Sequence, residues 1–106
     1  REVIMPVTLE ESAVGQWNLS LNGPLTIYEV AGIQEMLKPL TAPESLTVDL
    51  QEVDEIDTAG LQLLLALHQW LGEHLHLIRH SQAVIELIDL FQLAAFFGDD
   101  IVLPQH

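Results

Sequence analysis

The chain has 106 residues, of which 49% are hydrophobic, and it contains no cysteine, so disulfide bonds and thiolate metal sites are excluded. The chain has sixteen acidic residues but only three Lys and Arg residues, and the formal net charge of -13 argues against nucleic acid and anionic membranes as partners. The length suits one domain over residues 1–106, and with no secretory signal or membrane-length apolar run we expect a cytoplasmic protein.

The first elements predicted along the chain are a strand, a turn and a helix. Apolar and polar residues alternate over residues 16–21, which predicts a half-buried strand. Residues 22–24 (Asn-Gly-Pro) predict a turn after it. Thr26 followed by Glu29 forms a capping box, and an apolar stripe from Ile27 to Leu40 predicts a first helix that ends near Pro39.

A second strand and a very apolar helix come next. Residues 46–50 alternate like the first strand and lead into an acidic segment, which we expect to be a solvated loop. Residues 59–71 are apolar almost all round and stop at Gly72, a suitable C-terminal cap. This helix should be the most buried in the protein. The acidic residues concerned are Asp49, Glu52, Asp54, Glu55 and Asp57.

The last third of the chain repeats the pattern. Residues 74–78 alternate as a strand, Ser81 is a candidate cap for a third helix, and Gly98 should end that helix before a strand at 101–103. Strands that alternate with helices of this length predict a single α/β domain, in which a mixed β-sheet is packed with helices. The expected core consists of Val48, Leu50, Leu61, Leu64, Leu65, Leu77, Val84, Leu87 and Phe91.

The segment that could carry a site is the start of the second helix. Unpaired backbone N–H groups and the positive end of the helix dipole favour Asp57 or Thr58 as a cap there, and they would favour a phosphate too. Gly60 has no Cβ, so a partner could approach Thr58 closely. From spacing alone, a simple cap followed by a turn is the more ordinary interpretation of Asp57–Gly60.

The run Val53–Leu61, with sequence VDEIDTAGL, resembles the signature of the STAS domain family, the sulfate-transporter and anti-sigma-factor-antagonist domains. The similarity extends to residues 19–23, 46–50 and 81–97. In that family the hydroxyl residue directly after the aspartate accepts a phosphate from a partner kinase, which implies that Thr58 is the phosphoacceptor. Family regulators often carry serine there and a second hydroxyl residue next, where this chain has Thr58 and Ala59. The family's turn after the first strand often bears a carboxylate, and this chain has none. The resemblance implies a partner-binding surface made of Asp57, Thr58, Ala59, Gly60, Gly23, Pro24 and Leu25.

These observations lead to one preferred function and two alternatives. The resemblance implies a bacterial regulator that is not an enzyme, needs no cofactor, and binds an anti-sigma-type kinase or a chemotaxis-type signalling protein when Thr58 is unphosphorylated. The first alternative is an accessory subunit of an ABC lipid transporter, in which Thr58 contacts an ATPase without being phosphorylated. The second alternative is a metal-dependent enzyme that uses His74 and His76, although no third ligand stands at a fixed spacing from them.

Overall fold

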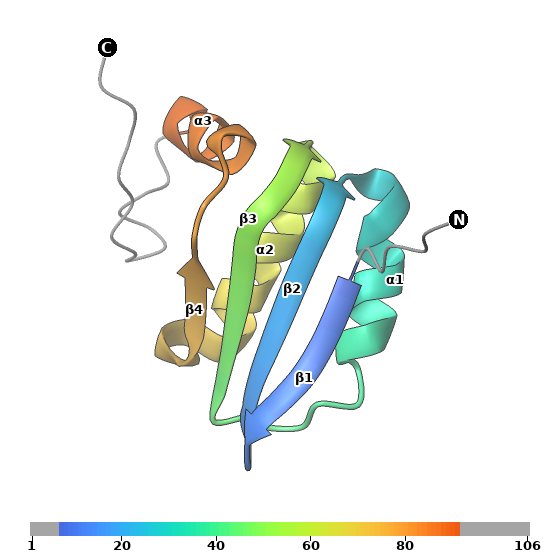
Figure 1. Ribbon diagram of the computed structural model, residues 1–106, viewed down its shortest axis with the longest axis vertical. Helices are drawn as coiled ribbons and strands as arrows, with labels where there is room; N and C mark the ends of the chain where they lie inside the picture. The colour runs from blue at the N-terminus through green and yellow to red at the C-terminus, as the bar shows by residue number, and fades with distance from the viewer. Residues whose placement is uncertain (1–6, 92–106) are drawn as a thin grey trace.

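The computed structural model describes residues 7–91, which form a four-stranded sheet with helices packed on it (Figure 1). No helix in this part of the chain is long and apolar enough to cross a membrane. The elements, in chain order, are β1 (Val7–Ala13), β2 (Gln16–Leu25), α1 (Ile27–Leu37), β3 (Ser45–Ile56), α2 (Thr58–Leu71), the short 3-10 helix η1 (Gly72–His74), β4 (Leu75–Ile78) and α3 (Gln82–Leu90).

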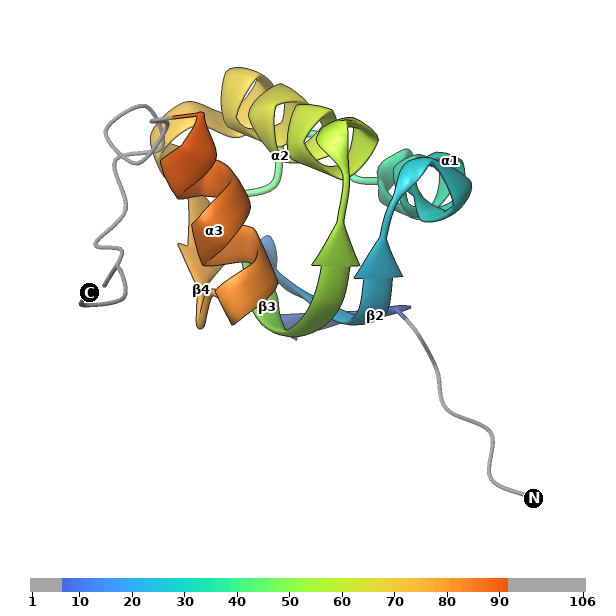
Figure 2. The same cartoon turned by 90° about the horizontal axis from the view of Figure 1, so that it is seen from above.

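The sheet is mixed, as predicted. Its strand order is β1-β2-β3-β4, with β1 antiparallel to β2 and with β2, β3 and β4 parallel to one another. Parallel neighbours need a crossover, and α1 and α2 supply it on the same face of the sheet (Figure 2). The carboxyl ends of β2 and β3 therefore reach the same edge, where each strand leads directly into the N-terminus of a helix.

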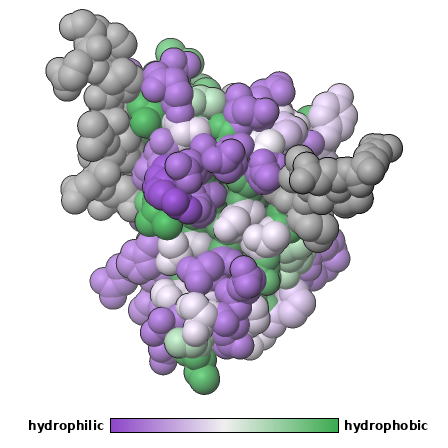
Figure 3. Space-filling view, in the orientation of Figure 1, coloured by the Kyte–Doolittle hydropathy of each residue, from purple (hydrophilic) through white to green (hydrophobic). Residues whose placement is uncertain are grey.

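The core lies between the sheet and its helices. Inward residues of β2 and β3 such as Leu19, Leu46 and Val48 are fully buried, whereas Asn18 and Ser20 point to the other, exposed face. Figure 3 shows that helix-free face, on which hydrophilic groups predominate. Six residues of α2 are buried, against two each in α1 and α3, so the prediction that this helix is the most buried is confirmed for the described part of the chain.

Most of the predicted core is confirmed, with one error. Of the nine residues, six are buried, and Leu65 and Leu87 are partly buried against the same cluster. Phe91 is 46% exposed, so its placement in the core was wrong. Helix α3 ends at Leu90, and the backbone at Phe91 is no longer helical (φ -95°, ψ 2°), so the helical period does not direct this side chain inward.

Three strand predictions need correction. Strand β1 was missed altogether. The turn predicted at residues 22–24 is part of β2, where Gly23 adopts a positive φ of 106° beside a shift in strand register. The acidic segment predicted as a loop is the second half of β3, because pairing with β2 continues as far as Ile56. The predicted strand at 101–103 and the stop at Gly98 lie outside the described residues.

The caps follow the sequence prediction closely. Thr26 and Glu29 form the complete capping box, in which the Thr26 N–H donates to Glu29 Oε1 at 2.8 Å. Ser81 caps α3 by accepting from the N–H of Val84, and Gly72 ends α2 with a positive φ of 55°. These short-range signals fix where the helices begin, and so they fix the geometry of the edge that carries Thr58.

Candidate functional site

The candidate site is the edge where the N-termini of α1 and α2 lie side by side, held together by Asp57. This residue ends the connection from β3 and is the N-cap of α2. The Gly60 N–H donates to its Oδ1 at 2.9 Å, and the N–H of Ile27, the first residue of α1, donates to its Oδ2 at 3.0 Å. The sequence predicted a cap here from Asp57 or Thr58, and Asp57 supplies it. The second bond joins the two helices through one carboxylate and could not be predicted locally, because Ile27 is 30 residues away.

These hydrogen bonds also determine the charge of Asp57. The bond from the Gly60 N–H, followed by the bond from Ile27, holds the pKa of this carboxyl below its usual value, against partial desolvation, which raises it. Donors that point at the ionised form favour that form. Asp57 therefore carries a full negative charge at neutral pH, directly beside Thr58.

Thr58 is the first residue of α2 and is exposed. Because Asp57 takes the capping position, the Thr58 hydroxyl is not needed to satisfy the helix, and no group among residues 7–91 forms a hydrogen bond with it. The side chain is therefore accessible to a modifying enzyme or to a binding partner without any change in the fold.

Gly60 allows close packing in the interior of the protein, whereas from the sequence we expected it to leave space for a partner. It is buried, and a Cβ placed on it would overlap the carbonyl oxygen of Leu25 and come within 2.9 Å of Ile56 Cγ1. The missing side chain lets α2 start against the end of β2. The expectation that Gly60 leaves room for a partner was wrong, because Leu25 already occupies that space.

The other predicted contact residues differ in exposure. Pro24 is exposed, Gly23 and Ala59 are half-buried, and Leu25 is completely buried. Leu25 and Gly60 therefore support the surface without forming it. The structure brings Pro24 and Thr58 to the same edge, at the ends of neighbouring strands β2 and β3.

Sequence reasoning missed two apolar residues at this edge. Ile27 was assigned to the buried stripe of the first helix, yet it is 62% exposed, and Tyr28 is 89% exposed. Both belong to the first turn of α1, next to the Asp57 bridge. A large apolar pair directly after a helix cap was the available signal, because Tyr28 directly follows Ile27 and so falls outside the i, i+3, i+4 spacing of an apolar stripe.

The surroundings of the site are acidic. Glu52, Asp54 and Glu55 are exposed on the last half of β3, and Glu55 lies opposite Pro24 in the strand register. Two cations fall within the described residues: Lys38 pairs with Glu35 at 3.3 Å, and Arg79 pairs with Asp49. Neither pair neutralises these carboxylates.

The histidines do not form a metal centre in the described part of the chain. His74 lies in η1, where its Nδ1 is 3.0 Å from the carbonyl oxygen of Glu44, and His76 is exposed on β4. No group of three His, Asp or Glu side chains converges among residues 7–91. The geometry gives the metal-enzyme alternative no support.

A mixed sheet with two crossover helices on one face, and an exposed threonine at the start of the second, defines a small α/β domain of the STAS type. The chain belongs to the STAS domain family: the family model described as "Mlab, STAS domain" matches residues 9–103. No curated protein sequence matches the chain significantly.

Solved structures agree on the fold. The unphosphorylated anti-sigma factor antagonist SpoIIAA is 18% identical, with a TM-score of 0.65 and 82% of each chain covered. A sulfate transporter family protein from Wolinella succinogenes is 17% identical, with a TM-score of 0.68, covering 84% of this chain and 76% of that one. SLC26A9 is 14% identical, with a TM-score of 0.56; the match covers 81% of this chain but 17% of that protein.

Proposed function

We propose that this domain is a cytoplasmic regulator that binds a protein partner through the edge around Thr58, and that phosphorylation of Thr58 releases the partner. The observation that carries the proposal is the exposed Thr58, placed at the start of α2 beside an aspartate whose two carboxylate oxygens each accept a backbone hydrogen bond. The likeness to the fold of an anti-sigma factor antagonist supports it, and an anti-sigma-type kinase or a chemotaxis-type signalling protein is the kind of partner we propose.

The chemistry of the site suits a switch better than catalysis. A phosphate on Thr58 would add about -1.5 to -2 charges at pH 7, beside ionised Asp57 and near Glu55. Within the domain, the α2 dipole offsets part of that repulsion by about 0.3–1 kcal/mol, so the fold should tolerate the modification. At an interface the phosphate must lose its water, and each 1.4 kcal/mol of such cost is about tenfold in affinity. The loss of binding should therefore exceed the loss of stability.

A second candidate keeps the same contact edge without phosphorylation. The fold matches include a sulfate transporter family protein, which supports an accessory role in a transporter as the second candidate. In this form Thr58 would contact a transporter ATPase directly. Both candidates need an exposed Thr58, and they differ in whether that hydroxyl is ever phosphorylated in the cell.

The experiment that separates them combines phosphosite mapping with two variants. The chain is isolated from its native cells and the modification of Thr58 is measured by mass spectrometry. Thr58→Glu and Thr58→Ala are then titrated against the partner captured by the unmodified protein. We expect Thr58→Glu to weaken binding by about tenfold or more, and Thr58→Ala to bind and to resist phosphorylation.

Thr41→Glu is the matched control for the added charge. Thr41 is exposed in the connection that leads from α1 into the start of β3, whereas Thr58 follows the end of β3. The two threonines therefore lie at opposite ends of this strand. This control should bind like the parent. An unmodified Thr58 together with strong loss of binding in Thr58→Glu would favour the accessory role. If both Thr58 variants bind like the parent, the contact edge itself has been assigned wrongly.

A further inference from the structure

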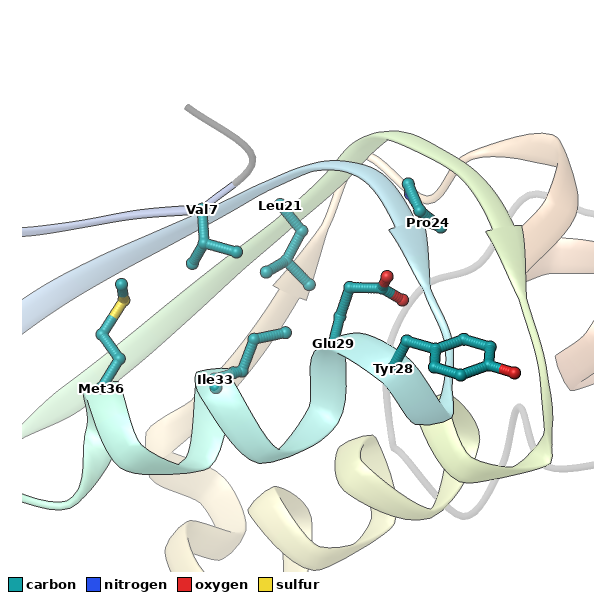
Figure 4. Close-up of a pocket in the computed structure, with 8 residues that line it drawn as sticks. Val7, Leu21, Pro24, Tyr28, Glu29, Ile33 and Met36 are labelled. Atoms are coloured by element: carbon teal, nitrogen blue, oxygen red, sulfur yellow. The ribbon is translucent and has the colours of Figure 1, made fainter. Parts of the chain in front are cut away.

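A second surface of the domain lies on the other side of α1. An apolar groove of about 440 Å³ runs between α1 and strands β1 and β2 (Figure 4). Figure 4 shows Val7 and Leu21 pointing from the strands toward Ile33 of α1, with Tyr28 and Met36 at the two ends. The groove is lined by Val7, Leu21, Pro24, Tyr28, Glu29, Gly32, Ile33 and Met36.

Gly32 keeps this groove open. Glycine in the interior of a helix costs about 0.5–1 kcal/mol relative to alanine, so a helical glycine usually occurs where a neighbouring group leaves no room for a side chain. No such neighbour exists at Gly32, because a Cβ there would meet nothing within 4 Å. Tyr28 and Met36 stand one turn away on either side, 89% and 37% exposed. The helix therefore presents a notch between two exposed side chains.

The charge of the groove and of the whole chain favours a cationic occupant. Glu29 is the one charged residue in the lining, whereas Glu55 lines a separate hollow beside α3. The described cations, Lys38 and Arg79, are paired with other carboxylates. With a net charge of -13, the chain repels fatty acids and anionic lipids and attracts cationic segments.

We propose that this groove is a second docking surface, which adjoins the Thr58 edge at Pro24 and Tyr28 but does not include Thr58, and that it binds an amphipathic segment of a basic protein. Apolar side chains of the segment lie over Gly32 between Tyr28 and Met36, in the manner of a helix in a groove. A Lys or Arg side chain on its flank faces Glu29. The groove faces β1, whereas α2 with Thr58 lies on the other flank of α1 (Figure 2), so the surface works whether or not Thr58 is a switch.

The test uses two synthetic peptides and nuclear magnetic resonance. Both peptides carry leucine at positions i, i+3, i+4 and i+7, and their polar positions are all lysine in one and all glutamate in the other. Each is titrated into the isotopically labelled chain. We expect the lysine peptide to shift the backbone amides of Gly32, Ile33 and Met36, and to bind at least about tenfold more tightly than the glutamate peptide.

Four variants check the position of the bound peptide and its independence from Thr58. Gly32→Leu should fill the groove and weaken the lysine peptide by at least about tenfold, whereas Gly32→Ala adds one methyl group and should change binding much less. Tyr28→Ala removes an exposed wall without touching the core, so it reports on the groove even if Gly32→Leu fails to fold. Thr58→Glu should bind the peptide like the parent, which separates this proposal from the phosphorylation switch.

Two results would overturn the proposal. One is a set of shifts confined to the acidic end of β3 and unchanged in Gly32→Leu and Tyr28→Ala, which would mean non-specific attraction. The other is saturation of the groove amides by oleate or by phosphatidylglycerol vesicles more tightly than by the lysine peptide, which would make the groove a lipid site.

Discussion

Helices α1 and α2 begin at the same edge of the sheet and share the carboxylate of Asp57, yet they are used in opposite ways. Helix α2 buries six of its residues, and Gly60 near its start is one of the six. Helix α1 buries two residues and exposes Ile27, Tyr28 and Met36. The more buried helix thus holds the exposed Thr58 hydroxyl at a fixed helix start, while the more exposed helix offers apolar surface for contact.

The two glycines express the same difference. A methyl group on Gly60 would overlap the Leu25 carbonyl, so this glycine is required by close packing of α2 on β2. A methyl group on Gly32 would meet open space. Glycine in a helix therefore has two distinct structural causes here, and substitutions at these positions should move stability in opposite directions.

The largest expected effect tests whether α2 is the helix that holds the core. Leu64 is fully buried on α2, and Leu64→Ala should lower the free energy of unfolding by about 2–5 kcal/mol. Met36→Ala on α1 is the control; because Met36 is partly exposed, it should cost clearly less. Urea denaturation of both variants measures the difference. Equal losses would mean that the two helices contribute alike and that the comparison is mistaken.

Gly60→Ala should have the next largest effect. The added methyl has to displace Leu25 or push the start of α2 outward, and overpacking of this kind costs about 1–3 kcal/mol. The displacement should also appear as altered amide signals at Asp57 and Ile27, because their hydrogen bond depends on the helix start. Chemical denaturation and amide spectra are the measurements. A variant as stable as the parent would show that this edge is softer than its contacts indicate.

Gly32→Ala should have a smaller effect with the opposite sign. Alanine has the higher helix propensity and meets no obstacle here, so the free energy of unfolding should rise by about 0.5–1 kcal/mol. The measurement is chemical denaturation, as for Gly60→Ala. The two variants can be compared directly because each adds one methyl group to a helical glycine. Destabilisation by Gly32→Ala would remove the basis for treating Gly32 as a position that packing leaves free.

The sequence predicted the elements whose signals are local. The capping box of Thr26 and Glu29, the Ser81 cap and the Gly72 stop each depend on residues within one helical turn, and all three are present in the structure. The family signature points to Thr58 as the phosphoacceptor, and that assignment stays a prediction. Strand β1 was missed because only Val7 and Leu9 are apolar at alternating positions, and its pairing with β2 is what stabilises it.

The geometry of the site depends on contacts between distant segments. The continuation of β3 through acidic residues follows from its pairing with β2, which overrides the low strand propensity of Asp and Glu. The bond from Ile27 to Asp57 and the packing of Gly60 on Leu25 likewise join residues about thirty positions apart. No pattern within a short window contains this information. The sequence could therefore predict the cap of α2, but not the hydrogen bonds through which Asp57 joins α1 to α2.

The smallest expected effect concerns the bridge itself, and it depends on pH. The pKa of Asp57 is lowered in the folded chain, so its ionised form stabilises the fold above the unfolded-chain value of about 3.9, and this contribution is lost as the pH falls through the folded value. Asp57→Asn keeps one acceptor oxygen but turns an N–H group toward the second donor. The variant should therefore be less stable than the parent at pH 7, by a constant margin down to about pH 5, and the margin should shrink below about pH 4.

Urea denaturation at a series of pH values measures that margin. The effect should be modest, because a partly exposed carboxylate is well screened by water. Asp54→Asn is the control, since it removes one negative charge from exposed β3 and so accounts for relief of the overall charge repulsion. A margin for Asp57→Asn that does not change between pH 7 and pH 3 would show that the two helix starts are joined by the shape of this side chain and not by its charge.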